Sequence, residues 1–486
     1  MAASADSATS AMVTATATGA TDAMAVKVVC AGCGAVAPRE RVFPARCDRA
    51  APGDGIDHLM TRHLDLSRVV LAADDDPNPF VRYRQMFHAW HVARAAGWSD
   101  ERYVELVRRF GRAVANVDGH GFQVSPLRRA DKLSASLGFA HASGVWVKDE
   151  TGGVAGSHKA RHLMGVMLEL LVAETLQPAL SDRPLTIASC GNAALAAAVV
   201  ARAAGRRLDV FVPSDADPSI LRRLERLDAR IELVGRSPGE AGDPTVRRMH
   251  AAIEAGAIPF TCQGTDNGLA IEGGATLGFE IAESLARDGV RLDHLLIQVG
   301  GGALASGCAQ GLAEARALGV IDSLPRLDTV QTTGAWPLRR AYDRVAASLR
   351  AWEVDPGRPV DLARPEVHTI LDHAARHRRK YMWPWETEPR SIAHGILDDE
   401  TYDWLAVVRA MLETGGQPVV VDETTLRSAN ALAVLAVGAN ADETGTAGLA
   451  GLIDLLGGGA VGRDERVAVI FTGIRRGVPE PNRSKR

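Results

Sequence analysis

One lysine stands where it could do covalent chemistry. Lys159 follows a glycine-rich loop and opens an apolar stretch in the segment VKDETGGVAGSHKARHLMGVMLELL. Partial burial at such a place disfavours the ammonium form and leaves a neutral amine that can condense with an aldehyde. A lysine that extends from a helix start toward solvent has the same local pattern, so this motif alone does not separate the two interpretations.

Two further segments could bind anions. SCGNAALAAAVVARAAG, from Ser189 to Gly205, places small residues before an Ala-rich helix, whose free N–H groups and dipole attract a carboxylate or phosphate. Simple capping by Ser189 or Asn192 is the alternative there. In QVGGGALASG the three consecutive glycines follow an apolar strand, and only glycine lets successive N–H groups converge closely on a phosphate. This pattern is not G-x-G-x-x-G, so it argues against a dinucleotide site.

The fourth feature is a hydroxyl near the C-terminus. The strand VAVIF runs into Thr472 and Gly473, and a hydroxyl at a strand end is usually structural. In this chain, however, four features follow one another along the sequence: the lysine, a helix start that could bind an anion, a glycine turn and a hydroxyl near the C-terminus. The combination is much more specific than any of its members.

In this combination the chain resembles the fold-type-II pyridoxal-phosphate enzymes, which include threonine synthase, the serine and threonine dehydratases, cysteine synthase and the tryptophan synthase β-chain. The resemblance covers roughly residues 120 to 475 and includes the segments SPLRRADKLSASLG, EGGATLGFEIAESL and SIAHGILDD. It implies a two-domain α/β fold, tryptophan synthase β-like, with parallel sheets flanked by helices and a helical N-terminal extension.

The resemblance also implies a role for each matching residue. Lys159 would form the Schiff base with pyridoxal 5'-phosphate and remove the α-proton of the substrate, with His158 near the cofactor phosphate and Asn192 at the ring hydroxyl. The phosphate loop would comprise Gly300, Gly301, Gly302 and Ala303, and the substrate carboxylate would be bound by Ser189, Cys190, Gly191 and Asn192. Departures from the family pattern are His158 and Ala160, which flank the lysine, and Cys190, where Ser or Thr is more usual.

Thr472 would lie beside the pyridine nitrogen of the cofactor. A neutral hydroxyl does not stabilise a protonated ring, so the electron sink is moderated and loss of a β or γ substituent is favoured over transamination. We therefore expect a lyase that catalyses β-elimination or β/γ-replacement on a small L-amino acid, threonine synthase-like or serine/threonine dehydratase (ammonia-lyase)-like. The alternative is a catalytically silent protein that keeps this fold to bind a ligand or a partner.

The pattern of elements supports an α/β fold. From Val145 onward, short β-rich runs alternate with apolar helical stretches, which predicts parallel sheets covered on both faces. The carboxyl ends of such strands are where ligands collect. We expect the chain to divide into a disordered leader (1–25), an N-terminal extension made of a degenerate ribbon and helices (26–119), a small α/β domain (155–255) and a large α/β domain (120–154 together with 256–480).

Residues 336–390 have a different composition and are expected to form an insertion in the large domain. A basic run from His377 to Lys380 precedes Tyr381, Met382 and Trp383. A solvated helix face that leads into a packed turn is the preferred interpretation. A specificity lid or a subunit contact is the alternative.

Cys30, Cys33 and Cys47 form a C-x2-C pair followed by a third thiol, as in one half of a zinc ribbon. A second C-x2-C would end at position 50, which is Ala50, and only His58 or His63 could substitute. We favour a degenerate knuckle that holds no metal, with zinc as the alternative.

The composition is that of an ordinary globular protein. The 486 residues are 46% apolar with a formal net charge of -4 and scattered Lys and Arg, so neither nucleic acid nor anionic lipid is an indicated partner. No apolar run approaches the roughly 18 residues of a membrane span. Six cysteines in a chain of this size do not make a disulfide framework, which fits a reducing cytoplasm. The partners we expect are a small amino-acid substrate and, from the family resemblance, a second copy of the chain in a homodimer or larger homo-oligomer.

Overall fold

A computed structural model describes residues 24–51, 53–237 and 242–476 of the chain. The leader predicted over residues 1–25 lies outside this range except for Met24 and Ala25. Among the described residues, no helix combines the length and the apolar character that crossing a bilayer requires.

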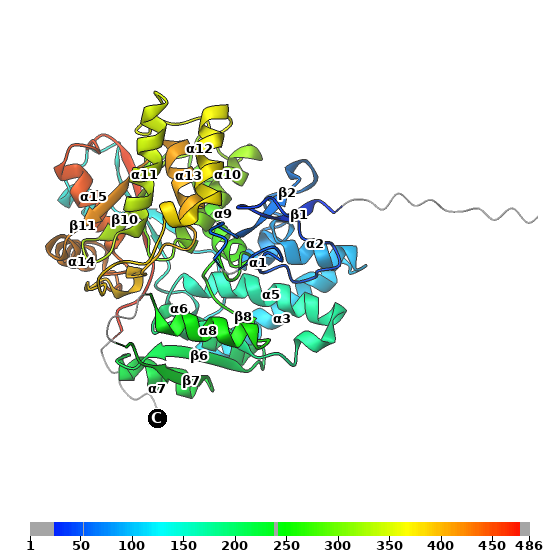
Figure 1. Ribbon diagram of the computed structural model, residues 1–486. Coiled ribbons are helices and arrows are strands. Elements are labelled where there is room, and N and C mark those ends of the chain that lie inside the picture. Colours follow the sequence, from blue (N-terminus) through cyan, green and yellow to red (C-terminus); the bar gives the residue numbers. More distant parts are fainter. Residues whose placement is uncertain (1–23, 52, 238–241, 477–486) are drawn as a thin grey trace, which may run out of the picture.

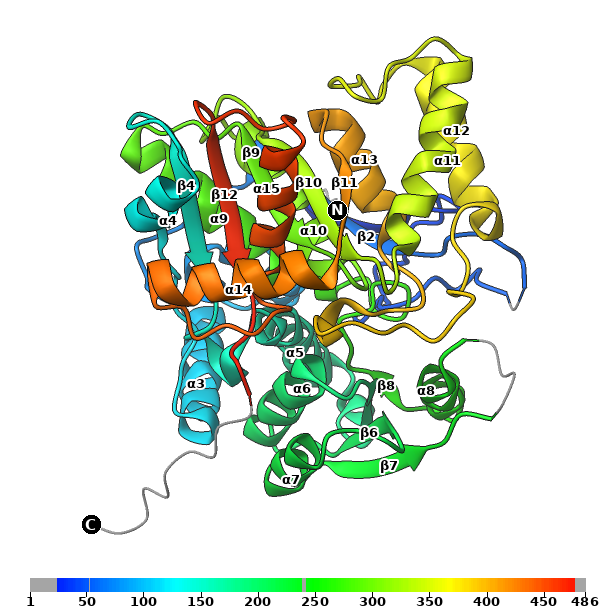
Figure 2. The ribbon, with the colours of Figure 1, turned by 90° about the vertical axis from the view of Figure 1, so that its left-hand side faces the viewer.

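The larger sheet has six strands in the order β11-β10-β9-β12-β4-β3 (Figures 1 and 2). Its strands are β3 (Leu127–Arg129), β4 (Gly144–Asp149), β9 (His294–Gln298), β10 (Arg326–Thr332), β11 (Pro418–Val421) and β12 (Arg466–Phe471). All neighbours are parallel except β3, which pairs antiparallel with β4 at one edge. The helices of this domain are α4 (Asp131–Ser136), α9 (Ala270–Asp288), α10 (Ala303–Ala317), α11 (Pro337–Ala351), α12 (Pro365–Arg376), α13 (Trp404–Thr414), α14 (Glu423–Val437) and α15 (Ala447–Gly457).

The alternation of side chains along β12 shows how both faces of this sheet are covered. Val467, Val469 and Phe471 belong to a hydrophobic cluster with α4, α14 and α15. Ala468 and Ile470 point to the other face and join the main core, which includes α9, α10 and α13. A strand buried on both faces reads as a continuous apolar run, and VAVIF is such a run.

The smaller sheet has four strands in the order β7-β6-β5-β8, all parallel. They are β5 (Leu185–Ala188), β6 (Leu208–Pro213), β7 (Arg230–Val234) and β8 (Ile258–Pro259), with helices α5 (Lys159–Leu176), α6 (Asn192–Ala203), α7 (Pro218–Arg226) and α8 (Pro244–Glu254). This sheet therefore takes its last, very short strand from the segment after residue 255. Figure 2 shows it below the larger sheet, with α5 and α6 between the two.

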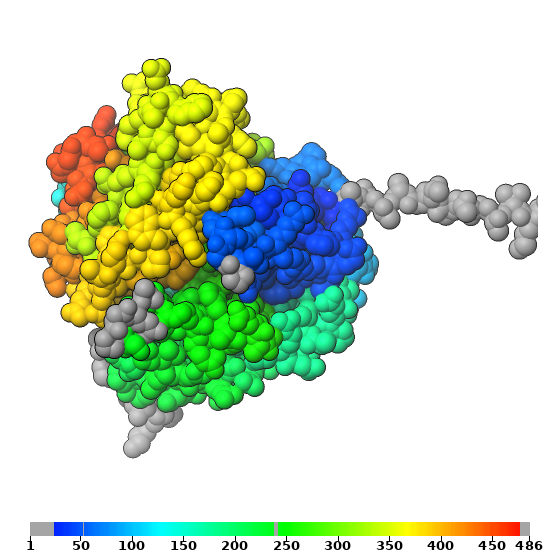
Figure 3. Space-filling model, in the orientation of Figure 1, coloured from blue at the N-terminus to red at the C-terminus, as the bar shows by residue number. Residues whose placement is uncertain are grey.

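The N-terminal segment adds an antiparallel pair of strands and three helices. These are β1 (Val26–Cys30), β2 (Met60–Leu64), α1 (Pro79–Arg82), α2 (His88–Ala95) and α3 (Asp100–Asp118). Helix α2 packs on α5 and α3 packs on α6, so this segment covers the outside of the smaller domain. In Figure 3 its first part, in blue, lies against the region of α11 and α12 in yellow and against the smaller domain in green.

The predicted fold class is confirmed as a mixed α/β fold with parallel sheets and helices on their faces. The strands expected from Val145 onward are all present. Strand β10 was not predicted, because its sequence RLDTVQT carries Asp328, Thr329 and Gln331 at positions that the structure buries. Strands β1, β2 and β8 also escaped the pattern, because a short strand gives too few alternating positions to recognise.

Candidate functional site

The lysine singled out by the sequence opens helix α5 at the junction of the two domains. Lys159 is partly buried, and the loop before it turns sharply through Ala155 and Gly156, whose φ angles are 54° and 63°. Ile474 donates its amide to the Gly156 carbonyl at 3.0 Å, and Ser157 forms a β-bridge with Gly473. The start of α5 is thus attached to the end of β12.

Thr472 lies at this attachment and is buried. Its carbonyl accepts hydrogen bonds from His158, through the amide at 3.1 Å and through ring Nδ1 at 3.2 Å. Its hydroxyl accepts a hydrogen bond from Gln298 Nε2 at 2.8 Å. Since an hydroxyl has one proton to donate, this arrangement leaves the Thr472 O–H available to an acceptor in the site.

The two histidines close to Lys159 in the sequence have lowered pKa values. Burial, reinforced by the positive charge of Lys159, holds the pKa of His158 well below its usual value. Burial, again with Lys159 contributing, lowers the pKa of His162 to about 3. Both imidazoles are therefore uncharged at neutral pH, so neither adds a cation beside the lysine.

The glycine turn lies between β9 and α10, and another part of the chain covers it closely. A Cβ atom at Gly300 would come within 2.2 Å of Asp398 Oδ2, and one at Gly301 within 2.9 Å of the Tyr402 ring. Gly302 adopts φ +98°, in the left-handed region that favours glycine. The covering segment, residues 398–403, is fixed by two hydrogen bonds: Thr401 Oγ1 donates to the Gly300 carbonyl at 2.9 Å, and the Asp403 amide donates to the Gly301 carbonyl at 3.0 Å.

Asp398 connects this turn to the lysine. Its carboxyl group accepts a hydrogen bond from the Gly301 amide and lies within the electrostatic reach of Lys159. Burial raises the pKa of Asp398 to about 6, and the nearby carboxylates of Asp243 and Asp399 add to the effect. An anionic group of the protein itself therefore contacts the N–H-rich turn in this structure.

The third predicted segment follows strand β5. Ser189 Oγ accepts a hydrogen bond from the Gly191 amide at 3.4 Å, Cys190 is exposed, and Asn192 begins helix α6. A Cβ atom at Gly473 would lie 2.7 Å from Asn192 Nδ2, so this segment adjoins the strand end that carries Thr472. Arg476 reaches the same place and donates from Nε to Asn192 Oδ1 at 2.8 Å.

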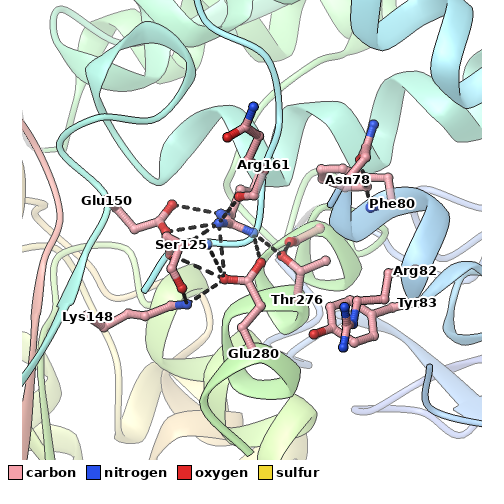
Figure 4. A network of polar contacts seen from close by, with 12 residues as sticks. Asn78, Phe80, Arg82, Tyr83, Ser125, Lys148, Glu150, Arg161, Thr276 and Glu280 are labelled. Atoms are coloured by element: carbon pink, nitrogen blue, oxygen red, sulfur yellow. Dashed lines mark hydrogen bonds and ion pairs between the residues drawn. The ribbon is translucent and has the colours of Figure 1, made fainter. Parts of the chain in front are cut away.

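A buried ionic network fixes the first turn of α5 (Figure 4). Arg161 contacts Glu150 at 2.7 Å and Glu280 at 2.6 Å, and Glu280 also contacts Lys148 at 2.5 Å. All four side chains are nearly inaccessible to solvent. Although burial acts to raise it, the charges of Arg161 and Lys148 hold the pKa of Glu280 below its usual value. Arg161, two residues after Lys159, therefore connects helix α5 to the end of β4 and to α9.

The structure thus places Lys159, His158, Thr472, the glycine turn and the Ser189–Asn192 segment around the junction of the two sheets. Ala303 is the first residue of α10, directly after the turn. Three nearby residues were missed by the sequence analysis: Gln298, Asp398 and Arg476. The acid in SIAHGILDD and the polar residue at the end of strand HLLIQ were the available signals for the first two. Arg476 gave none, because it comes after the last strand.

The sequence family described as pyridoxal-phosphate dependent enzyme matches residues 120–473. The threonine synthase of Methanosarcina acetivorans is 24% identical over 372 residues, covering 72% of this chain and 74% of that protein. The serine dehydratase-like protein of Mus musculus is 31% identical over 194 residues. That match covers 39% of this chain and 54% of the relative, so the chain spans about half the length of this relative.

Solved structures show the same fold. The processed form of threonine deaminase isoform 2 from Solanum lycopersicum superposes with a TM-score of 0.53 at 17% identity, over 78% of this chain and 91% of that one. The diaminopropionate ammonia lyase of Escherichia coli gives a TM-score of 0.53 at 17% identity, over 77% of this chain and 89% of that one.

Proposed function

The chain belongs to the pyridoxal-phosphate dependent enzyme family, and from this premise we propose that it is a lyase acting on a small L-amino acid by β-elimination or by β- or γ-replacement. The observation that carries this proposal is the Thr472 hydroxyl, which Gln298 fixes beside the segment that bears Lys159. A hydroxyl, unlike a carboxylate, donates to an unprotonated ring nitrogen and so limits the electron sink. That limitation favours loss of a substituent over transamination.

The residues present fit the cofactor, which for this family is pyridoxal 5'-phosphate. Gly300, Gly301 and Gly302 form a turn without side chains directly before α10, and its N–H groups can bind a phosphate in competition with the carboxyl group of Asp398. The buried Ser157 hydroxyl has no hydrogen-bond partner among the described residues, so it can take one from a bound group. We assign the phosphate to this turn and to His158, the ring hydroxyl to Asn192, the ring nitrogen to Thr472 and the aldehyde to Lys159.

When bound, the cofactor supplies a conjugated system that stabilises negative charge at the α-carbon of an amino acid. The chain supplies the rest of the chemistry. Lys159 Nζ is held at the start of α5, where it would bind the aldehyde of the cofactor and can accept the α-proton of the substrate. Because burial lowers the pKa of both His158 and His162, these imidazoles are weak proton acceptors, which leaves the lysine as the principal base of the site.

The charges around the site favour elimination over reactions of a phosphorylated substrate. The carboxyl groups of Asp398, at the glycine turn, and of Asp243 nearby already oppose the one phosphate of the cofactor, and a second phosphate on the substrate would add to this repulsion. Arg476, which contacts Asn192, can balance the single charge of the α-carboxylate. We therefore favour the serine/threonine dehydratase-like reaction over the threonine synthase-like one.

Purified protein supplied with pyridoxal phosphate tests this proposal. It is incubated separately with serine, threonine, diaminopropionate and phosphohomoserine, while ammonia, keto acid and phosphate are measured. We expect ammonia and keto acid from at least one of the first three compounds, and no product from Lys159→Ala. Phosphate release from phosphohomoserine alone would show the replacement reaction instead. A protein without visible cofactor absorbance or any product would support the catalytically silent alternative.

A further inference from the structure

Four side chains of metal-binding type converge in the N-terminal segment, away from the site described above. Cys30, Cys33, Cys47 and His58 place one ligand atom each so that all four lie within 4.8 Å of one another. The sulfurs of Cys33 and Cys47 are 3.7 Å apart, and Cys30 Sγ is 3.4 Å from His58 Nδ1. A tetrahedral zinc ion with Zn–S of about 2.3 Å and Zn–N of about 2.0 Å needs S···S of roughly 3.8 Å and S···N of roughly 3.5 Å. The two separations in the structure are close to these values.

The pairing of β1 with β2 places His58, the fourth ligand, beside the cysteines. Strands β1 and β2 are antiparallel with Cys30 opposite Met60, and the Ala31 amide donates to the Leu59 carbonyl at 2.8 Å. His58, just before β2, is thereby brought beside Cys30. The preference for a metal-free knuckle rested on Ala50, where a second C-x2-C would have ended. The structure supplies a ligand from outside that spacing.

Close packing fixes the two ligand-bearing loops against each other. A Cβ atom at Gly32 would lie 2.4 Å from the Asp57 carbonyl oxygen, so only glycine lets the Cys30–Cys33 turn approach the segment that carries His58. On the third loop, the Ala45 carbonyl accepts a hydrogen bond from the Gly268 amide at 3.0 Å, which anchors the turn that carries Cys47 to the main body.

The histidine is also oriented as a metal ligand would be. Its Nε2 is 2.8 Å from Asp54 Oδ2, which leaves Nδ1 directed at Cys30. Asp54 is itself fixed by the amides of Ala51 and Ile56, at 3.1 Å and 3.0 Å. A carboxylate on the far nitrogen of a metal-bound histidine sets its tautomer and its direction, and is the usual companion of zinc-binding histidines.

The four ligands lie in a small lobe of the chain, which runs from the start of β1 to the end of β2, and its size gives a physical reason for a metal. Its own buried apolar cluster consists of Val28, Cys30, Cys47, Met60 and Leu269, and one of these belongs to the main body. Units of about 40 residues or fewer seldom bury enough apolar surface to hold their shape without a metal or a disulfide. The cysteines of the described residues are all free, so no disulfide stabilises this lobe.

We propose that Cys30, Cys33, Cys47 and His58 form a structural zinc site. Three thiolates and an imidazole in tetrahedral arrangement are a donor set that selects zinc over oxygen-preferring cations. Four protein ligands leave no position for water or substrate, so the site is structural and not catalytic. Arg46, directly before Cys47, and Arg49, two residues after it, offset the net negative charge of three thiolates around a divalent ion, while Asp48 between them is paired with Arg41.

The location of this site connects it to the glycine turn. Asp57, next to His58, is buried and pairs with Arg378 at 3.1 Å, and Arg378 pairs with Glu400 at 2.5 Å. Backbone hydrogen bonds at 2.8 Å join Asp57 to Ala375 and Arg378 to Gly55. Glu400 belongs to the segment 398–403 that covers the glycine turn. The zinc site therefore holds the lobe against the 336–390 insertion and, through Arg378, supports that segment.

The full-length protein, produced with zinc in the medium and desalted over chelating resin, provides the first test. Metal content measured by plasma mass spectrometry should be about one zinc per chain. Replacement by cobalt(II) should give the strong visible bands of a tetrahedral thiolate site. Zinc far below one per chain, iron in its place, or a Cys33–Cys47 disulfide in the protein as isolated would overturn the proposal.

Matched variants then identify the ligands. His58→Ala and Cys33→Ser should lower the zinc content at least fivefold, whereas His58→Cys, which keeps a fourth ligand, should retain it. His63→Ala is the control, because His63 is an exposed histidine of the adjacent strand β2. Equal loss of zinc from His63→Ala and His58→Ala would contradict the assignment. Should a variant fail to fold, the cobalt spectrum of the unmodified protein still decides whether the site is tetrahedral and thiolate-bound.

Discussion

The carbonyl oxygen of Thr472 accepts two hydrogen bonds from His158, one from its amide at 3.1 Å and one from its ring Nδ1 at 3.2 Å. The residue before helix α5 is thereby fixed to the residue that directly follows strand β12. Since Lys159 follows His158 directly, the position of the amine is set by a strand of the larger domain. The hydroxyl of the same threonine is held by Gln298.

Replacement of the Thr472 hydroxyl tests its part in the reaction. Thr472→Ser keeps a donor and should retain kcat/KM within about threefold. Thr472→Val removes the donor, and loss of one hydrogen bond worth ~1.4 kcal/mol in the transition state should lower kcat/KM about tenfold. Steady-state kinetics with the accepted amino acid provide the measurement. Equal activity of the serine and valine variants would show that the hydroxyl is only structural.

Removal of Arg161 should destabilise the whole fold. Arg161→Leu leaves Glu150 and Glu280 buried with fewer partners, and breaking a buried ion pair costs about 3 to 5 kcal/mol. Urea unfolding followed by circular dichroism measures the change. Arg112→Leu is the control, because Arg112 and its partner Glu105 are each 63% exposed and such pairs contribute roughly 0 to 1 kcal/mol. Similar losses in both variants would argue against a stabilising role for the network.

Buried His162 should make the fold sensitive to acid. Its pKa of about 3 in the folded state lies below the unfolded value near 6.5, so the unfolded state takes up the proton first. The contribution of His162 to stability is therefore complete above pH 6.5 and is lost as the pH falls toward 3. Between pH 7 and pH 5 this loss amounts to about 2 kcal/mol. In His162→Gln the fall in unfolding free energy over that range should be smaller by this amount, and an unchanged fall would refute the prediction.

Asp398 should oppose cofactor binding above its pKa of about 6. The ionised carboxylate accepts the hydrogen bond of the Gly301 amide and repels a phosphate. The protonated carboxyl group carries no charge and repels a phosphate much less. Asp398→Asn should therefore tighten pyridoxal phosphate binding about fivefold at pH 8, from ~1 kcal/mol of relieved repulsion, with little change at pH 5. The binding of pyridoxal phosphate to both proteins is measured by fluorescence at both pH values. The protonation of the phosphate itself is the same for the two proteins, so it drops out of the comparison. Weaker binding by the variant at pH 8 would mean that Asp398 helps to hold the cofactor.

The sequence predicted those parts of the fold whose signal is local. Lys159, Thr472 and the glycine turn each follow or precede an apolar run, so their places at strand and helix ends could be recognised from periodicity. The fold class followed from the alternation of strands and helices. The boundaries of the units remain expectations, as do the chemical roles assigned to the site residues.

What the sequence did not predict depends on contacts between distant segments. Asp398 reaches Gly300 across about a hundred positions of the chain, and Gln298 meets Thr472 across 174. His58 meets Cys30 only because β1 and β2 pair in a particular register, which neither strand is long enough to reveal. Strand β10 was missed because the residues it buries are polar, each with a partner that only the folded chain provides, as when Asp328 pairs with His294 at 2.6 Å.

The most direct test of the account is to locate the covalent bond between protein and cofactor. Borohydride reduction of the protein loaded with pyridoxal phosphate, followed by proteolysis and mass spectrometry, should give a single modified lysine at Lys159. The Lys159→Ala protein should give none and should lose the visible absorbance of the cofactor. Modification of a different lysine, or an unmodified wild-type protein after saturation with the cofactor, would contradict the central claim.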